Sequence, residues 1–403
     1  MKRTLGIFTI SLLALMAIAG TTHAAKQRGG GGTPTQAPQV PVPESNPLTP
    51  EKIQLGRQLF RDRNLSDPNA GRTRVACSTC HSGMMGLGFS DGRVRSTGVL
   101  GRQGKRNSPT VFNAAFLHSQ FWDGRAQNLI DPVTGETLAG TSLEAQALGP
   151  IQDPLEMNNT PENVARYVLN AYRSALLGAF PEIQQYLGTQ YEVPVVFQAV
   201  GKAIASFERT VLSFNAPYDA YVAGNTSALS NQQIQGMALF EGKGNCTACH
   251  AAPYFNDALY NNANNTGFHN LGVFRQGFET DTNDAEGGPL FSNSDLPEYE
   301  GYDLGRYYVS NDFADIGRFK TPTLRQLLCT SPYFHNGKYT NLRDAVEFVV
   351  RGTVTGANDR FENDYIGTVE STIQTIRSEP WSDQEINNLT AFVRSLSGNC
   401  GGM

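Results

Sequence analysis

Apolar and polar positions follow mainly the period of an α-helix along this chain. Thr49 suits an N-cap and Pro50 a first turn, and apolar residues then recur at helical spacing up to Phe60. Further helices are predicted at residues 109–117, 161–178 and 194–214, from 231 toward 246, and from 382 to 396. Alternating strand patterns are scarce, so the pattern predicts a mainly α fold with long ordered loops.

One arrangement occurs twice: a helix, a Gly-x-x-Leu-Phe segment, a loop and a C-x-x-C-H motif. The Gly-x-x-Leu-Phe segments begin at Gly56 and Gly236, and the C-x-x-C-H motifs occupy residues 77–81 and 246–250. Such an internal repeat predicts two small helical domains of similar construction. Residues 218–229 suit the crossover, so the predicted domains are 49–217 and 218–403.

The C-x-x-C-H motif is the attachment pattern of c-type haem. Two thiols one helical turn apart can add to the porphyrin vinyl groups, and the adjacent imidazole reaches the iron. A thioredoxin-like redox pair needs no following His, and a structural zinc site needs four closed ligands. Two covalently bound haems c are therefore predicted, in two cytochrome c-like domains. The residues that would hold them are Cys77, Cys80 and His81 in the first domain and Cys246, Cys249 and His250 in the second.

The beginning of the chain has the pattern of a secretory signal peptide at residues 1–25. Basic residues precede an apolar run at 5–19, and small residues follow it. The run is too short for a membrane span, so no integral span is expected after signal removal. Residues 26–48, rich in Gly and Pro, predict a flexible-to-extended leader. The protein is expected to be periplasmic or otherwise exported, and the leader would also allow association with a surface.

The net charge bears on the possible partners, and the two cysteines outside the haem motifs bear on a possible disulfide bond. The formal net charge is −5 and no basic block occurs, so nothing indicates a nucleic-acid partner. Cys329 and Cys400 remain after the haem motifs are assigned, in a compartment that permits disulfides. Whether the two form a disulfide stays open at this stage, because geometry decides it.

Two stretches without periodicity are predicted to lie over the haems. Residues 83–105 are rich in Gly and Arg and predict a loop that wraps the first haem. Residues 256–318 are rich in Asn, Gly and Asp and could form a lid over the second.

Several short motifs resemble those of the bacterial di-haem cytochrome c peroxidase family, which includes MauG. They are RNSPT at 106–110, FWDGRA at 121–126, EMNNTP at 156–161, FKTPTLR at 319–325 and PYFHNG at 332–337. The likeness keeps the same order from about residue 48 to 397. It implies an enzyme that uses hydrogen peroxide, with a peroxidatic N-terminal haem and an electron-transfer C-terminal haem. Its partner would be a protein electron donor or a protein substrate.

The resemblance also implies roles for single residues. Trp122 matches the tryptophan that the family places between its haems as a relay, although a large aromatic residue can serve packing alone. Gln146 and Glu156 match residues over the open face of the peroxidatic haem. A Glu at that place can move a proton between the two oxygens of peroxide and so assist cleavage of the O–O bond.

A calcium site between the haems is implied in the same way. Asn107, with the backbone carbonyls of Thr330 and Pro332, matches the family's calcium ligands. Hard oxygen ligands suit Ca2+, and ordinary turn chemistry is the alternative explanation of these residues.

The first departure from the family pattern concerns the loop after the first haem. Classical members carry a His there that blocks the iron until the other haem is reduced. In this sequence Val99 falls near that place, and residues 82–105 contain no His. The resemblance therefore implies a five-coordinate N-terminal haem in the oxidised state, as in MauG, with Met84 or Met85 as the alternative ligand.

The second departure concerns the sixth ligand of the C-terminal haem. Other members place a Met or a Tyr where this sequence has Val349, which cannot bind iron. His269, Tyr339, another loop residue or no ligand at all remain the alternatives.

Three functions are compatible with these expectations. The first is a MauG-like enzyme that oxidises a partner protein by long-range electron transfer. The second is a conventional cytochrome c peroxidase supplied by a small cytochrome or copper protein. The third is an electron carrier with both irons saturated, in which Glu156 and Gln146 would have no role.

Overall fold

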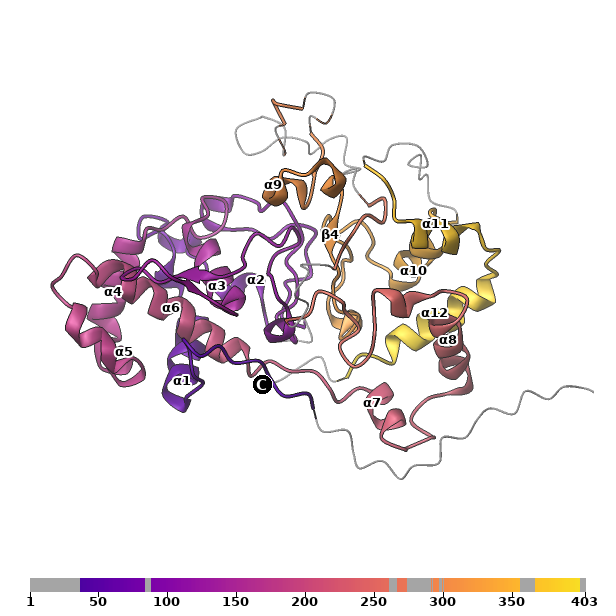
Figure 1. The fold of residues 1–403 in the computed structure, drawn as a ribbon, viewed down its shortest axis with the longest axis horizontal. Helices are drawn as coiled ribbons and strands as arrows, with labels where there is room; N and C mark the ends of the chain where they lie inside the picture. The colour runs from indigo at the N-terminus through magenta and orange to yellow at the C-terminus, as the bar shows by residue number, and fades with distance from the viewer. Residues whose placement is uncertain are drawn as a thin grey trace, which may run out of the picture.

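The computed structural model describes residues 37–83, 88–260, 267–273, 291, 293–296, 299, 301–355 and 367–398. This part of the chain is mainly α-helical, which confirms the predicted fold class (Figure 1). The helices are α1 (Pro50–Leu59), α2 (Cys77–Cys80), α3 (Ser142–Gln152), α4 (Pro161–Ala171), α5 (Arg173–Ala179), α6 (Glu192–Glu208), α7 (Pro217–Val222), α8 (Asn231–Glu241), α9 (Tyr307–Ser310), α10 (Leu342–Arg351), α11 (Ser371–Ser378) and α12 (Asp383–Arg394).

Strands and 3-10 helices are short. Strands β1 (Leu129–Ile130) and β2 (Thr137–Leu138) form one antiparallel pair, and β3 (Phe268–His269) and β4 (Phe319–Lys320) form another. The 3-10 helices are η1 (Arg63–Leu65), η2 (Gly71–Thr73), η3 (Val99–Gly101), η4 (Ala114–Phe116), η5 (Pro181–Tyr186), η6 (Cys246–Ala248), η8 (Phe313–Asp315) and η9 (Leu327–Cys329).

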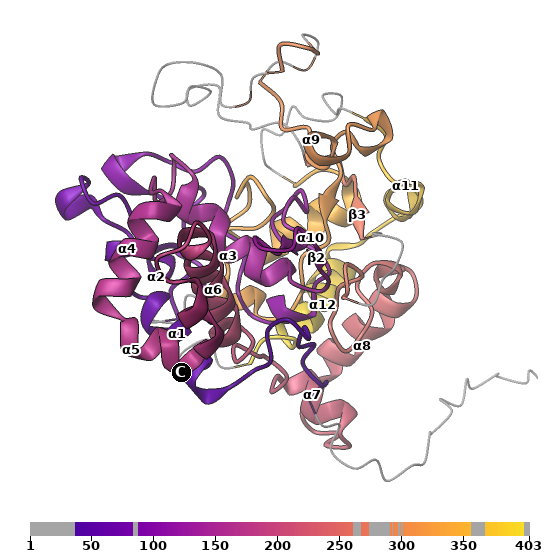
Figure 2. The same cartoon turned by 60° about the vertical axis from the view of Figure 1, so that its left-hand side comes forward.

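The elements form two lobes that lie side by side (Figures 1 and 2). The first lobe contains α1 and α3 to α6, and the second contains α8 and α10 to α12. The largest cluster of buried apolar residues in the first lobe has members between Leu55 and Val211, and that of the second between Tyr218 and Leu396. The chain thus changes from one large core to the other between Val211 and Tyr218.

Each lobe is built on a close contact between two helices. Gly56 of α1 lies against α6, where a Cβ atom would come within 1.8 Å of the Ala203 carbonyl oxygen. Gly236 of α8 lies against α12, where a Cβ atom would come within 1.9 Å of the Asn388 carbonyl oxygen. Any larger side chain would push the helices apart, so both contacts require glycine.

The phenylalanines of the Gly-x-x-Leu-Phe segments repeat this relationship one helical turn later. The ring of Phe60 packs on Phe207 of α6 with centroids 5.1 Å apart and an interplanar angle of 59°. The ring of Phe240 packs on Phe392 of α12 with centroids 5.1 Å apart and an angle of 60°. The repeat predicted from the sequence is therefore a repeat of packing geometry as well.

Local capping explains the helices whose starts were predicted correctly. The Thr49 side chain accepts from the Lys52 N–H at the start of α1. Ser230 and Ser382 form capping boxes at the starts of α8 and α12.

Three predicted helices were wrong in part. Residues 109–117 contain only η4, because Asn113 has a left-handed backbone (φ 59°) and its side chain bonds to Ser213. The helix predicted at 161–178 is interrupted at Tyr172, whose hydroxyl donates to Asp62. The helix predicted at 194–214 ends at Glu208, and the Thr210 hydroxyl donates to the carbonyl of the last turn.

The end of the predicted leader is anchored to the first lobe. Residues 37–48 contain neither helix nor strand, but Asn46 is fully buried. Its amide nitrogen donates to Glu144 at 2.9 Å, and its amide oxygen accepts from the Lys52 ammonium at 3.1 Å. The prediction of a flexible-to-extended leader over residues 26–48 is therefore wrong at its end, where Asn46 is anchored. Residues 1–36, with the predicted signal peptide, lie outside the described residues.

Among the helices described above, none combines the length and the apolar character needed to cross a membrane. Cys329 is buried and takes part in a disulfide bond. Cys400 lies outside the described residues, so the pairing of these two cysteines stays a prediction.

Candidate functional site

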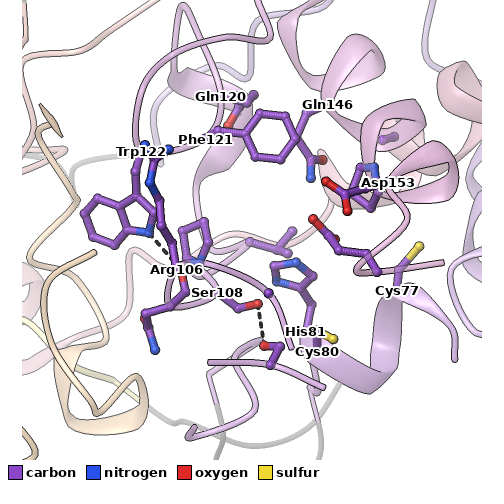
Figure 3. A pocket seen from close by; sticks show the side chains of 18 of the residues that line it. Cys77, Cys80, His81, Arg106, Ser108, Gln120, Phe121, Trp122, Gln146 and Asp153 are labelled. Atoms are coloured by element: carbon purple, nitrogen blue, oxygen red, sulfur yellow. Dashed lines mark hydrogen bonds between the residues drawn. The ribbon is translucent and has the colours of Figure 1, made fainter. Parts of the chain in front are cut away.

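A cavity of about 430 Å³ lies beside the first C-x-x-C-H motif. Cys77 and Cys80, at the two ends of α2, and the following His81 line one side of it. Gln146 of α3 lines the cavity as well, and Figure 3 shows its side chain pointing toward the His81 imidazole across the open space. The structure thus brings the predicted attachment residues and the predicted peroxide-handling residue Gln146 to one cavity.

Both motif histidines are held by a backbone carbonyl. Nδ1 of His81 lies 3.3 Å from the Phe89 carbonyl oxygen, and Nδ1 of His250 lies 2.9 Å from that of Phe255. When Nδ1–H donates to these carbonyls, Nε2 is the nitrogen that remains for a metal. Burial lowers the pKa of both imidazoles, which favours the neutral form that metal binding needs.

The two carbonyls come from residues in an uncommon backbone conformation. Phe89 has φ 56° and Phe255 has φ 52°, and both side chains are buried. A left-handed backbone is a genuine outlier for a bulky residue and costs about 1–3 kcal/mol. The same device therefore orients the histidine in both lobes, and the sequence carried no signal for it.

Glu156 lines the same cavity, where its surroundings change its pKa. Burial and, to a smaller extent, the nearby Asp153 carboxylate raise the pKa of Glu156 to about 7, against the lowering effect of Arg125. Both protonation states are then populated at neutral pH, as a general acid–base catalyst requires. Sequence reasoning missed Asp153 and Arg125, because only the fold places them beside Glu156.

The loop after the first motif places Val99 against this acid. Val99 is fully buried in the core, and its N–H donates to the Glu156 carbonyl at 2.8 Å. Residues 88–105 contain neither His nor Met, and Met84 and Met85 lie outside the described residues. Among the described lining residues the one methionine is Met157, whose side chain belongs to the buried core.

A second buried acid lines the first cavity. Glu208, at the end of α6, is 4% exposed, and its Oε2 atom has no hydrogen-bond partner among the described residues. Burial raises the pKa of Glu208 to about 8, against the lowering effect of Arg209. This residue was not predicted from the sequence, although an acid within the apolar run of the helix predicted at 194–214 was a usable signal.

A second cavity, of about 260 Å³, lies beside the second motif. It is lined by Cys246, Cys249 and His250. Val349 of α10, which stands where other members of the family place a Met or a Tyr, also lines it. The remaining lining is mostly apolar.

Helices α3, α10 and α11 were not predicted from the sequence. The apolar spacing of Leu342, Ala345 and Phe348 in α10 was nevertheless a usable signal.

The alternative ligands at the second cavity differ in their surroundings. His269 lines the cavity and its Nε2 pairs with Asp257 Oδ2 at 2.7 Å, next to Cys249. Tyr339 is buried and is not among the described lining residues. His335, which is not one of these alternatives, also lines the cavity, and its ring stacks on Phe319 with centroids 3.6 Å apart. The loop 256–318, predicted as a lid, is described only in part.

Trp122 lies in the wall that the two cavities share. The residues that line both are Asn107, Ser108, Pro109, Thr110, Gln120, Phe121 and Trp122. The Trp122 indole N–H donates to the Asn107 carbonyl at 2.8 Å (Figure 3). Its own carbonyl accepts from the Lys320 N–H at 2.7 Å. The tryptophan is thus fixed from both lobes in the wall between the two cavities.

The residues of the predicted calcium site line one cavity. Asn107, Thr330 and Pro332 all line the second cavity. The Asn107 amide nitrogen donates to the Arg93 carbonyl at 2.7 Å, which leaves its amide oxygen to act as a ligand.

Beside this wall, an ion-pair network joins the lobes. The Arg106 guanidinium forms a bidentate pair with Asp303, with both distances 2.6 Å, and a further pair with Asp123 at 2.6 Å. The three side chains are nearly buried, and the two carboxylates hold the pKa of Arg106 above its ordinary value against the effect of burial.

Comparison with known proteins gives a consistent result. Residues 50–227 match the family model "Di-haem cytochrome c peroxidase". The chain is 32% identical to cytochrome-c peroxidase IdrP1 of Pseudomonas sp. (strain SCT), over 96% of this chain and 91% of that protein. It is 32% identical to methylamine utilization protein MauG of Methylorubrum extorquens, over 89% and 81%. It is 31% identical to cytochrome c551 peroxidase of Pseudomonas aeruginosa, over 89% and 84%.

A solved structure shares the fold. The crystal structure of a MauG-like protein associated with microbial copper homeostasis superposes with a TM-score of 0.66 at 28% identity, over 90% of this chain and 94% of that one.

Proposed function

Because the chain belongs to the di-haem cytochrome c peroxidase family, we propose that it is an exported, MauG-like peroxidase that oxidises a partner protein. Family membership itself makes the chain a peroxidase-family oxidoreductase with haem c as its cofactor and hydrogen peroxide as its oxidant. The proposal adds the open N-terminal haem, the route between the haems and the protein substrate.

The residues around each cavity fit a c-type haem. Cys77 and Cys80 would hold the first porphyrin, and His81, aligned by the Phe89 carbonyl, would bind its iron. Cys246, Cys249 and His250 would do the same in the second cavity. A haem with an open axial position supplies the redox chemistry with peroxide.

Glu156 would carry the proton in this reaction. Its carboxylate accepts a proton from one oxygen of the bound peroxide and returns it to the other oxygen, which leaves as water. The carboxyl group ends in the state in which it began. The side chain of Gln146, with donor and acceptor atoms, would hold the peroxide in place across from His81.

The observation that carries the proposal is the environment of Val99. Classical members of the family are expected to have a blocking His near this place. Here the residue is apolar and buried, and its backbone is bonded to the Glu156 segment. The described part of this loop brings no ligating side chain to the first cavity, so the enzyme would react without prior reduction.

Low-temperature EPR of the ferric protein tests this directly. We expect a high-spin signal from the first haem that is lost when peroxide is added without a reductant. Two low-spin signals that do not respond to peroxide would contradict the open haem. That outcome would favour reductive activation or a simple electron carrier.

A conventional peroxidase is the second candidate. IdrP1 and cytochrome c551 peroxidase carry that activity in their names, and they match this chain as well as MauG does. Steady turnover with a reduced small cytochrome or copper protein would support this function. Formation of oxidised Trp or Tyr products on a partner protein would support the MauG-like one.

Trp122 would connect the two haems, and Ca2+ would bind beside it. The position of Trp122 in the wall shared by the two cavities supports the relay, and the presence of Asn107, Thr330 and Pro332 in the lining of one cavity supports the ion. Elemental analysis of the purified protein after exhaustive dialysis should find about one calcium per chain. Its absence would remove calcium from the proposal without affecting the haems.

A further inference from the structure

The second cavity contains one buried cation without a counter-charge in contact. Lys320, the second residue of β4, is 7% exposed and lines the cavity. Its ammonium group makes no hydrogen bond and no ion pair with any described residue. Lys52 is also 7% exposed, but its ammonium donates to Asn46 at 3.1 Å and to the Pro47 carbonyl at 3.0 Å.

The backbone fixes Lys320 at this position. Its N–H donates to the Trp122 carbonyl at 2.7 Å, and β4 pairs with β3 so that Lys320 lies opposite Phe268. The next residue, Thr321, donates its N–H to the Gly267 carbonyl at 2.9 Å. Since its backbone is tied on both sides, the lysine is held in the cavity wall by the fold.

The two nearest acids do not serve as direct partners. Asp123 and Asp257 both favour the charged form of Lys320, but burial dominates and lowers its pKa to about 8. Asp123 is paired with Arg106 and Arg125, and Asp257 is paired with His269. Both acids therefore have a cationic partner other than Lys320.

A buried ammonium without a partner destabilises a folded protein, so such a group is expected to meet an anion. A haem brings two propionate carboxylates, which are its only charged substituents. We infer that Lys320 binds a propionate carboxylate of the haem in the second cavity and thereby sets the orientation and reduction potential of that haem. This inference rests on the haem assignment above and not on the identity of the protein substrate.

The test compares reduction potentials of the purified holoprotein and its variants. Lys320→Met removes the charge and keeps the length of the side chain, and Lys320→Arg keeps the charge. Lys243→Met removes a lysine from the same lobe, where Lys243 is paired with Glu385 at 2.8 Å and partly exposed. Spectroelectrochemical titration gives the potential of each haem separately.

A nearby cation favours the ferrous state, so its loss should favour the ferric state. We expect Lys320→Met to shift the ferric–ferrous equilibrium of the second haem about tenfold toward ferric, which is about 59 mV for one electron. The first haem should keep its potential. Lys320→Arg and Lys243→Met should leave both potentials close to those of the wild type.

An unchanged second potential in Lys320→Met, with both haems present by pyridine haemochrome assay, would overturn the inference. So would loss of an axial ligand from the second iron in that variant, because Lys320 would then bind iron. If Lys320→Met loses haem, a second measurement replaces the titration. Infrared redox-difference spectra are then compared between the wild type and Lys320→Arg, both carrying haem labelled with 13C at the propionate carboxyls. A carboxylate band that differs between the two supports the contact, and an identical band overturns it. Loss of the protein-oxidation activity alone leaves these measurements unaffected.

Discussion

The N–H of Val99 donates a 2.8 Å hydrogen bond to the carbonyl of Glu156. Next to it, Gly98 approaches the same segment so closely that a Cβ atom would lie 2.1 Å from the Leu155 carbonyl oxygen. The loop after the first motif and the proposed acid–base residue are therefore one packed unit. A glycine at 98 and a buried apolar residue at 99 keep this part of the loop against the Glu156 segment.

Replacing the acid tests its role in peroxide cleavage. Glu156→Gln keeps the size of the side chain but removes the proton carrier, so the rate of reaction with peroxide should fall by about two to four powers of ten. Stopped-flow absorbance of the ferric protein mixed with peroxide measures the rate. The exposed Glu162→Gln, in the first turn of α4, is the matched control and should react like the wild type. A wild-type rate in Glu156→Gln would exclude this residue as the acid–base catalyst.

The pH dependence of the same reaction should follow Glu156. The carboxylate form accepts the first proton, so the rate should rise with pH through an apparent pKa of about 7 and then level off. Asp153→Asn removes a neighbouring negative charge and should move this pKa downward. Arg125→Gln removes a neighbouring positive charge and should move it upward. If both variants keep the wild-type profile, another group controls the reaction.

Local signals allowed part of this structure to be predicted from the sequence. Thr49, Ser230 and Ser382 mark helix starts because their caps involve residues only three positions away. The cysteines and histidines of the motifs were recognisable because haem attachment fixes their spacing. By contrast, the break at Tyr172 depends on Asp62, more than a hundred residues earlier, which no local pattern contains.

The environment of the site was hidden for the same reason. The sequence indicated Glu156 through its motif, but its pKa depends on burial and on the charges that the fold brings near it. The carbonyls of Phe89 and Phe255 align the histidines through backbone conformations that favour glycine rather than phenylalanine. Because phenylalanine rarely adopts such a conformation, the residue type gives no hint of this role. Lys320 belongs to the FKTPTLR motif at 319–325. Only the three-dimensional structure shows that its ammonium group has no partner among the described residues.

Replacing the tryptophan in the shared wall tests the connection between the haems. Trp122→Phe should leave the reaction of the first haem with peroxide near the wild-type rate. Oxidation of the second haem should become a separate phase at least about tenfold slower, which corresponds to about 1.4 kcal/mol in the barrier. The control is Trp381→Phe. Trp381 is the other tryptophan of the chain, buried in the second lobe with its indole N–H bonded to the Ile376 carbonyl. Simultaneous oxidation of both haems at the wild-type rate in Trp122→Phe would contradict the relay.

Removing the central cation of the network between the lobes should destabilise the protein. Arg106→Met leaves the carboxylates of Asp123 and Asp303 buried without their partner, at a cost of about 3–5 kcal/mol in the free energy of unfolding. Denaturation in guanidinium chloride, followed by far-UV circular dichroism, measures the loss. Lys243→Met breaks a partly exposed pair and should cost less than about 1 kcal/mol. Equal losses in the two variants would show that the buried ion pairs of Arg106 stabilise the protein no more than the partly exposed pair of Lys243.

The buried acid at the end of α6 should make stability depend on pH. The pKa of Glu208 rises from 4.5 to about 8 on folding, chiefly because the carboxyl group is buried. The folded state then binds more protons than the unfolded state between these values, so this group lowers stability as the pH rises. The slope within that window is about 1.4 kcal/mol per pH unit for one group. Glu208→Gln cannot ionise and should lose this part of the slope, so it should be more stable than the wild type at pH 7.5 and similar to it near pH 4.5. Guanidinium denaturation at several pH values from 4.5 to 8 compares the two proteins. Parallel stability curves would mean that Glu208 is ionised and compensated in the folded protein.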